Sequence, residues 1–426
     1  MQFNGLSLEQ APPISAPLRF YLSAPLFAIL AGILMLLSDV SALQSRYSID
    51  SIVITHTITI GFMSFVMLGS LTQMLPVLAG VKMYRVDLVT KISHIAMVLG
   101  TLFMIVGLKF EVALLNAFAM LLLGSGFLAM IVVIFMAIKK VKNFTPTVTG
   151  MSLSLVFALF SVLMGIFLLF SYIDPDASIY RNIVANTHSV WAIFGFAGIL
   201  IVGVTFQVLP MFYVAPKFKD FYQKRVVLFI SISLILWMIT SLFFQSYAVA
   251  AKLWIVLFFA SFAIVFLLKI KNRKRKVSDI TLLYYKTSSI FLALGSLFWI
   301  GDEFYLSQHI VVTSIFIGGF ILSIMIGMLY KIVPFLIWFH LNAMGYMNIP
   351  TMNEMIDKKL ALIQFILFVG SLLGFIFSYY LEAYLSLFSM AFIISMVILQ
   401  YNIITAVLIY KRVKKTKPDF DMSAFA

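Results

Sequence analysis

Long apolar runs constrain this chain more than any other feature. Stretches of about 20 mostly apolar residues recur along almost all of its 426 residues. With 63% hydrophobic and only 11% charged residues, the chain has too little polar surface to cover a soluble domain. Backbone groups in lipid must be satisfied internally, which leaves helices or a closed barrel. The runs are too long and too continuously apolar for barrel strands, so the sequence predicts an all-α polytopic membrane protein.

We predict twelve membrane-spanning helices in a single membrane domain over residues 1–426. Their approximate ranges are 18–39, 51–79, 88–108, 111–138, 147–172, 182–212, 223–245, 248–270, 280–300, 304–337, 359–380 and 383–410. The first helix is not preceded by a basic segment and is not followed by a cleavage site. We therefore expect it to be a retained span and not a removed signal peptide.

Lysine and arginine residues are distributed unevenly over the predicted loops. Of the 30 basic residues, 26 fall with one set of alternate loops and four with the opposite set: Arg46, Lys109, Arg181 and Lys252. The basic loops are expected to be cytoplasmic, and an even number of spans brings both termini to that side, as in a multi-pass protein of a bacterial inner membrane. The run KIKNRKRK at 269–276 then predicts contact with the anionic lipid bilayer, and the net charge of +14 does not indicate nucleic acid.

The second, sixth and tenth predicted helices share one gap-free frame, G-F-x6-G-x3-(Q/K)-x2-P. It reads GFMSFVMLGSLTQMLP at 61–76, GFAGILIVGVTFQVLP at 195–210 and GFILSIMIGMLYKIVP at 319–334. A frame that returns every ~130 residues predicts an internal threefold repeat. The repeats would be four-helix units of approximately 15–145, 146–277 and 278–412. Because all three run in the same direction, we expect a pseudo-threefold bundle about the membrane normal.

The frame has a sufficient structural interpretation. Its glycines let membrane helices approach closely, and its proline ends or kinks the helix. The polar position of the frame holds Gln73, Gln207 and Lys331, which we expect to bond to neighbouring helices or to reach the interface. The frame therefore predicts packing and not chemistry.

A histidine precedes each frame in the same apolar segment: His56, His188 and His309. Ionisable residues inside a membrane are rare and costly, so three of them at the outer ends of equivalent helices favour a function over simple interhelical hydrogen bonds. Neutral imidazole is the usual axial ligand of b-type haem and a good ligand for copper. His94 and His340 fall near the inner side, and we interpret both as structural or interfacial.

Several kinds of chemistry are excluded by what the sequence lacks. Without cysteine there can be no disulfide, thiolate metal site, iron–sulfur cluster or covalently attached c-type haem. No phosphate-binding loop, nucleophile elbow or zinc motif is present. The histidines are therefore the strongest candidates for a functional site.

In its twelve helices, its repeated frame and its three histidines, the chain resembles subunit I of the haem–copper oxidase superfamily. The resemblance is greatest to the branch of the cbb-type oxidases and nitric oxide reductases, together with NnrS-like membrane proteins. It implies three four-helix arcs, with haem b bound by His56 and His309 and copper bound by His188. It also implies a respiratory-chain or redox partner, and a role in electron transfer, sensing or the response to nitric oxide.

The chain departs from the family pattern at the copper centre. The family has a His-x-His pair in the tenth helix, which would fall near Val312 and Ser314 when aligned on Gly319; only His309 stands in this helix. The seventh helix, at 223–245, lacks the histidine pair that binds copper in the family. We therefore expect no complete haem–copper centre and no oxygen reduction by the family mechanism. Whether the chain is an enzyme stays open, and no residue is assigned a catalytic role.

The spacing of the histidines favours a site made by two of them. They stand 20, 22 and 25 residues before their prolines. At ~100° per residue of regular helix, His188 and His309 lie about 60° apart, and His56 points well away from both. A bis-histidine haem between two helices is then easier to build than a copper site with three histidines.

Two other functions remain open from the sequence. A transporter or channel would need polar residues along a path through the membrane, and the middle of the predicted spans has few of them. A cofactor-free structural or assembly partner would need the histidines only as hydrogen-bonding groups between helices.

Overall fold

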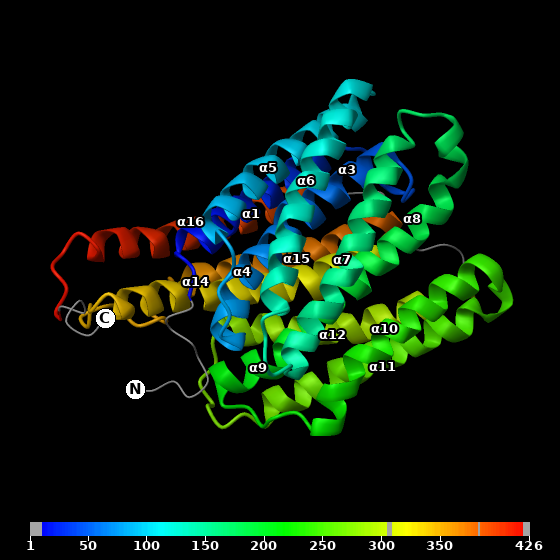
Figure 1. Ribbon diagram of the computed structural model, residues 1–426. Coiled ribbons are helices and arrows are strands. Elements are labelled where there is room, and N and C mark those ends of the chain that lie inside the picture. The colour runs from blue at the N-terminus through cyan, green and yellow to red at the C-terminus, as the bar shows by residue number, and fades with distance from the viewer. Residues whose placement is uncertain (1–10, 305–308, 382–383, 421–426) are drawn as a thin grey trace.

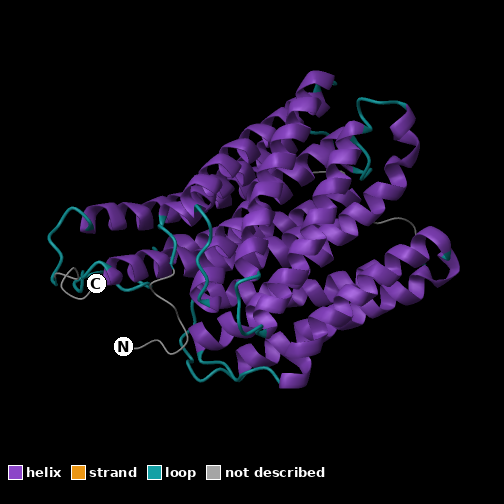
Figure 2. Cartoon of the chain, viewed as in Figure 1, coloured by secondary structure: helices purple, strands orange, loops and turns teal. Residues whose placement is uncertain are grey.

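The computed structural model describes residues 11–304, 309–381 and 384–420. These residues form a bundle of helices joined by short loops, and that part of the chain contains no strand (Figure 2). Within these described residues, twelve continuous helical spans are long and apolar enough to cross a membrane. The predicted class, an all-α protein with twelve membrane spans, is therefore confirmed at this level.

The helices follow the predicted spans closely, and several spans are built of consecutive segments (Figure 1). The first third of the chain forms α1 (Ser15–Leu36), α2 (Val40–Leu43), α3 (Ile49–Ile58), η2 (Thr59–Ser64), α4 (Phe65–Ala79), α5 (Val86–Lys109) and α6 (Ala113–Ile138). The middle third forms α7 (Pro146–Phe170), η3 (Asp176–Tyr180), α8 (Arg181–Val190), η4 (Trp191–Gly198), α9 (Ile199–Tyr213), α10 (Asp220–Phe243), η5 (Gln245–Tyr247) and α11 (Ala248–Lys271). The last third forms α12 (Ile280–Gly301), α13 (His309–Ser314), η6 (Ile315–Leu322), α14 (Ser323–Ala343), α15 (Lys358–Leu381) and α16 (Leu385–Val413). The sixth span begins at Asp176, earlier than predicted, because the short helix η3 extends it.

The three helices that carry the repeated frame share a local irregularity. Each widens from an α-helix to a π-helix just where the frame begins, in η2, η4 and η6. All three π segments end twelve residues before the proline of their frame, at Ser64, Gly198 and Leu322. Ser64 donates a hydrogen bond from its hydroxyl to the carbonyl oxygen of Thr59, five residues earlier, at 2.8 Å. Such bulges are uncommon and occur frequently at functional sites.

The first glycine of each frame lies against a phenylalanine of the preceding span. A Cβ atom added at any of these glycines would come within 2.6 Å of the ring, so only glycine fits. The pairs are Gly61 with Phe27, Gly195 with Phe157, and Gly319 with Phe291. This is the close helix approach predicted for the frame.

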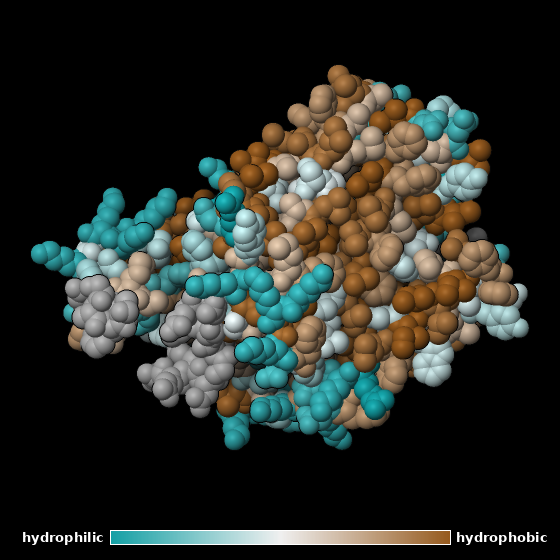
Figure 3. Space-filling model, viewed as in Figure 1, coloured by the Kyte–Doolittle hydropathy of each residue, from teal (hydrophilic) through white to brown (hydrophobic). Residues whose placement is uncertain are grey.

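The outside of the bundle is apolar. In Figure 3 hydrophobic residues cover the middle of the molecule, and hydrophilic residues gather toward its ends. Large side chains such as Leu121 of α6, Ile232 of α10 and Trp254 of α11 are more than half exposed on this surface. A belt of this kind suits contact with lipid chains.

The ends of the motif helices that carry the prolines (the proline end) hold their polar groups in pairs. Lys331 is buried, and its Nζ atom lies 3.0 Å from Oδ2 of Asp279, which caps the N-terminus of α12. Tyr213, at the end of α9, donates a hydrogen bond to the same carboxylate at 2.9 Å. The predicted interhelical bond of Lys331 is therefore confirmed. The prediction that Gln73 bonds to a neighbouring helix is wrong for the described chain, because neither the nitrogen nor the oxygen of its buried amide has a partner there.

Candidate functional site

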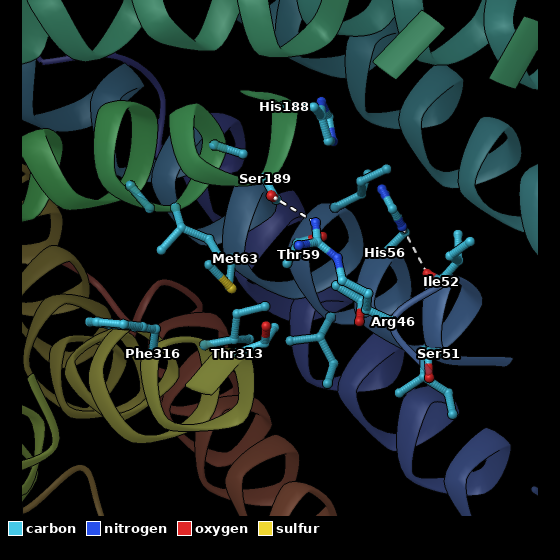
Figure 4. Close-up of a pocket in the computed structure, with 18 of the residues that line it drawn as sticks. Arg46, Ser51, Ile52, His56, Thr59, Met63, His188, Ser189, Thr313 and Phe316 are labelled. Atoms are coloured by element: carbon cyan, nitrogen blue, oxygen red, sulfur yellow. Dashed lines mark hydrogen bonds between the residues drawn. The ribbon is translucent and has the colours of Figure 1, made fainter. Parts of the chain in front are cut away.

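A cavity lies at the opposite ends of the motif helices, which carry the histidines (the histidine end). Its volume is about 430 Å³. Residues of all three motif helices line it, among them Met63, Phe196 and Phe316, together with residues of the neighbouring spans. His56 and His188 also lie in its wall (Figure 4). The cavity is thus mostly apolar, with a few polar groups that point to a bound molecule.

Both imidazoles are fixed by the backbone. Nδ1 of His56 lies 2.8 Å from the carbonyl oxygen of Ile52, one turn earlier in α3. Nδ1 of His188 lies 2.9 Å from the carbonyl oxygen of Ser161 in α7. A carbonyl oxygen can only accept, so each Nδ1 carries a proton and donates it. In a neutral ring the lone pair is then on Nε2, which is how a metal-binding histidine is normally arranged.

The two rings lie next to each other across the cavity. Their centres are 6.0 Å apart and their planes differ by 17°. Two imidazoles that bind one metal atom through Nε2, with bonds of about 2 Å, have their centres about 6 Å apart. In the described chain neither Nε2 atom has a hydrogen-bond partner. The distance between the ring centres is therefore compatible with a bis-histidine site.

Regular helical geometry predicts that His56 faces away from His188, and the π segments explain why this prediction is wrong. It assumed 100° per residue throughout, whereas a π-helix turns less per residue and shifts everything before it. Counted from the start of the π segment, His56 and His188 are equivalent: each stands three residues before it, at Thr59 and Trp191 respectively. His309 stands six residues before Ile315.

The third histidine lies at the edge of what the structure describes. His309 is the first residue of α13, and its side chain is outside the described residues, so its predicted role as a haem ligand is neither supported nor contradicted. The residues after it, Ile310, Val312 and Thr313, line the cavity. The tenth span therefore also contributes to the site.

Gly165 of α7 makes room for His188. A Cβ atom at this position would lie 3.2 Å from Cε1 of the imidazole, closer than most real contacts. The position of the ring therefore depends on a residue without a side chain. Sequence reasoning missed Gly165, because it lies outside the repeated frame.

The two remaining histidines lie outside the cavity. Nε2 of His94 is 2.8 Å from the hydroxyl oxygen of Ser23, and its ring packs edge-on against Phe20. His340 is near the proline end and packs against Phe339. Neither residue lines the cavity, and the buried Nε2 atom of His340 has no partner among the described residues.

Two arginines in the cavity wall were not predicted as site residues. Arg46 precedes α3 and Arg181 begins α8, and both line the same cavity as the histidines. The sequence did contain a signal, since these are two of only four basic residues on the predicted outer side. Asp302, at the end of α12, also lines the cavity.

The donor set limits which metal group could be held here. Among the described residues no three histidine, cysteine, aspartate or glutamate side chains come together as a metal site. A metal ion that takes all its ligands from side chains would need three or four of them. Haem brings four nitrogen ligands of its own and needs at most two from the protein, so the histidine pair fits haem better than copper.

No protein-family model matches the chain, and no curated protein matches it significantly.

Proposed function

We propose that this chain is a haem-binding membrane protein in which His56 and His188 are the two axial ligands. The observation that carries the proposal is the pair of rings with centres 6.0 Å apart, each held by Nδ1 to a backbone carbonyl. The sequence suggested haem b on His56 and His309 and copper on His188. The geometry favours His56 with His188 for haem, and it offers copper only two imidazoles.

The residues of the chain would orient and shield the cofactor. The carbonyl groups of Ile52 and Ser161 keep each imidazole in one tautomer and at one angle, which costs no reorganisation when the iron binds. Apolar side chains such as Met63 and Phe316 keep water away from the site. When bound, haem supplies one-electron redox chemistry.

These features favour electron transfer or sensing over oxygen reduction. A haem held by both His56 and His188 would have no open position for a substrate, and no group of three or more metal-binding side chains comes together among the described residues. We place this role in the respiratory chain or in the response to nitric oxide, with a redox partner in the same membrane.

We further infer that the scaffold is that of oxidase subunit I, with three like units around a pseudo-threefold axis. The three π segments and the three glycine–phenylalanine contacts support it. The charge distribution supports a bacterial inner membrane with both termini in the cytoplasm. Because the chain has no cysteine, single cysteines at Lys140 and Lys109 can be labelled without background. Labelling of position 140 from the outside would contradict this orientation.

An optical spectrum tests the proposed function. Protein purified from haem-replete cells should show a Soret band and bind one haem per chain by the pyridine haemochrome assay. His56→Ala and His188→Ala should each abolish most of the band, because each variant removes one of the two imidazoles that would hold the iron. His94→Ala is the matched control and should keep it, since His94 bonds to Ser23 outside the cavity.

Other results would redirect the proposal. A colourless, metal-free preparation would leave the transporter and the cofactor-free assembly partner as the remaining functions. Loss of the band in His309→Ala together with its persistence in His188→Ala would show that the pair is His56 and His309, as the sequence first suggested.

A further inference from the structure

The cavity wall carries two arginines, Arg46 and Arg181, that form no ion pair with a carboxylate of the described residues. Arg46 donates a hydrogen bond from Nη2 to the hydroxyl oxygen of Ser189, the neighbour of His188, at 3.2 Å (Figure 4). Arg181 donates from Nε to the hydroxyl oxygen of Ser171 at 2.9 Å and also bonds to the carbonyl oxygen of that residue. Its guanidinium lies 4.0 Å above the centre of the Tyr172 ring. In the described chain neither arginine has a carboxylate within ion-pair distance.

Other partly buried cations of the chain do have carboxylate partners. Lys252 lies 2.6 Å from Glu303, and Lys109 lies 3.2 Å from Asp50. Holding a guanidinium beside an apolar cavity costs free energy unless an anion compensates it. Each guanidinium has five N–H donors, so both arginines have donors left over after the bonds described above. Two such groups on one cavity wall indicate a ligand with negative charges.

The arginines are placed with the histidines. Arg46 lies ten residues before His56, and Arg181 lies seven residues before His188. Each arginine therefore stands just before, or at the start of, the helix that carries the histidine. The hydrogen bond of Arg46 to Ser189 ties the two segments together. A molecule held between the two imidazoles would therefore have both arginines at one edge.

Resting on the proposed function, we propose that Arg46 and Arg181 bind the two carboxylates of the haem. The arginines orient the macrocycle so that its carboxylate edge faces the segments that precede α3 and α8. They also make the site prefer a porphyrin with two carboxylates over an uncharged one. Arginine suits this task because its planar fork can form two parallel hydrogen bonds with one carboxylate.

Haem dimethyl ester tests this inference, because it keeps the iron and the macrocycle and removes both charges. Apoprotein from haem-deficient cells is titrated with haem and with the ester, and binding is followed at the Soret band. We expect the ester to bind about ten- to a hundred-fold more weakly, since hydrogen bonds to charged groups contribute about 1.5–3 kcal/mol. In the double variant Arg46→Gln and Arg181→Gln, the ratio of the two affinities should fall toward one.

Two arginines on the other side of the protein give the control. Arg85 and Arg225 stack on Tyr84 and Phe221 and do not line the cavity. Changing both to glutamine should leave the ratio unchanged. The comparison in the unmodified protein needs no variant, so it stays informative if a variant misfolds.

The outcomes separate this inference from the function on which it rests. If haem and its ester bind equally well and both give the histidine-dependent band, the arginines do not bind the carboxylates and the proposed function stands. If the apoprotein binds neither compound, the proposed function falls and this inference falls with it.

Discussion

The two ends of the motif helices use polar residues in different ways. At the proline end, Lys331 and Tyr213 both bond to Asp279. At the histidine end, His56 and His188 each keep one nitrogen without a partner among the described residues, beside a cavity of about 430 Å³. At the proline end the Lys331–Asp279–Tyr213 cluster holds helices together, although the buried amide of Gln73 has no partner among the described residues. At the histidine end the free imidazole nitrogens face a cavity large enough for a ligand.

The difference divides the repeated segments into a structural part and a functional part. The glycines, which occur in all three frames, pack against phenylalanines and leave no room for a substituent. The histidines lie ahead of the frame, beyond the π segments. Substitutions at the two ends should therefore affect two different quantities, stability and haem affinity.

The largest effect is expected at the proline end, from Lys331→Met. The change leaves the Asp279 carboxylate, whose side chain is only 23% exposed, without its cation. We expect the free energy of unfolding to fall by about 2–3 kcal/mol, because breaking a buried ion pair on one side leaves an uncompensated charge. Unfolding in sodium dodecyl sulfate measures the loss, and the haem affinity of the folded protein should not change.

Two further variants sharpen this prediction. Lys359→Met removes an exposed lysine at the start of α15 and should have little effect. Adding Asp279→Asn to Lys331→Met should restore part of the stability, because asparagine still caps α12 but has no charge. A haem affinity that falls while stability is kept would contradict the division between the two ends.

A smaller loss of stability is expected from Gly195→Ala. The new methyl group would lie 2.5 Å from the ring of Phe157, so the helices must move apart. Overpacking of this kind costs about 1–3 kcal/mol. The same change at Gly370, where a Cβ atom meets nothing within 4 Å, is the control and should not destabilise. Combining Gly195→Ala with Phe157→Leu should recover stability; without such recovery the close approach is not the cause.

The sequence was sufficient for the fold at the level of spans. Apolar runs of membrane length, separated by short polar loops, leave little choice but twelve helices, and the ends of the spans were predicted to within six residues. The π segments were not predicted, because a shift from i→i+4 to i→i+5 bonding depends on how neighbouring helices pack and has no clear local signature. One π segment is enough to change the angle, about the helix axis, of every residue that precedes it in the same span.

The candidate site was predicted in its residues and not in its arrangement. His56 and His188 were chosen because histidine is rare inside a membrane, which is a property of composition. Their pairing depends on the π segments, so regular helical geometry gave the wrong face for His56. Arg46 and Arg181 were counted only as charges of the outer loops, since nothing in their spacing shows that the loops fold over the cavity.

The smallest effect, and the most specific to the histidine end, is expected from Gly165→Ala. The methyl group would lie 3.2 Å from Cε1 of His188 and 3.8 Å from Nδ1, so the ring must move by a few tenths of an ångström. We expect haem affinity to fall about three- to ten-fold, which corresponds to about 0.7–1.4 kcal/mol, with little change in the free energy of unfolding. Gly69→Ala is a matched control, because its methyl group would lie 3.0 Å from Cβ of Phe20, which does not line the cavity. If both variants change haem affinity equally, or if only stability responds to Gly165→Ala, then His188 does not hold the iron and the histidine end is packing like the rest of the bundle.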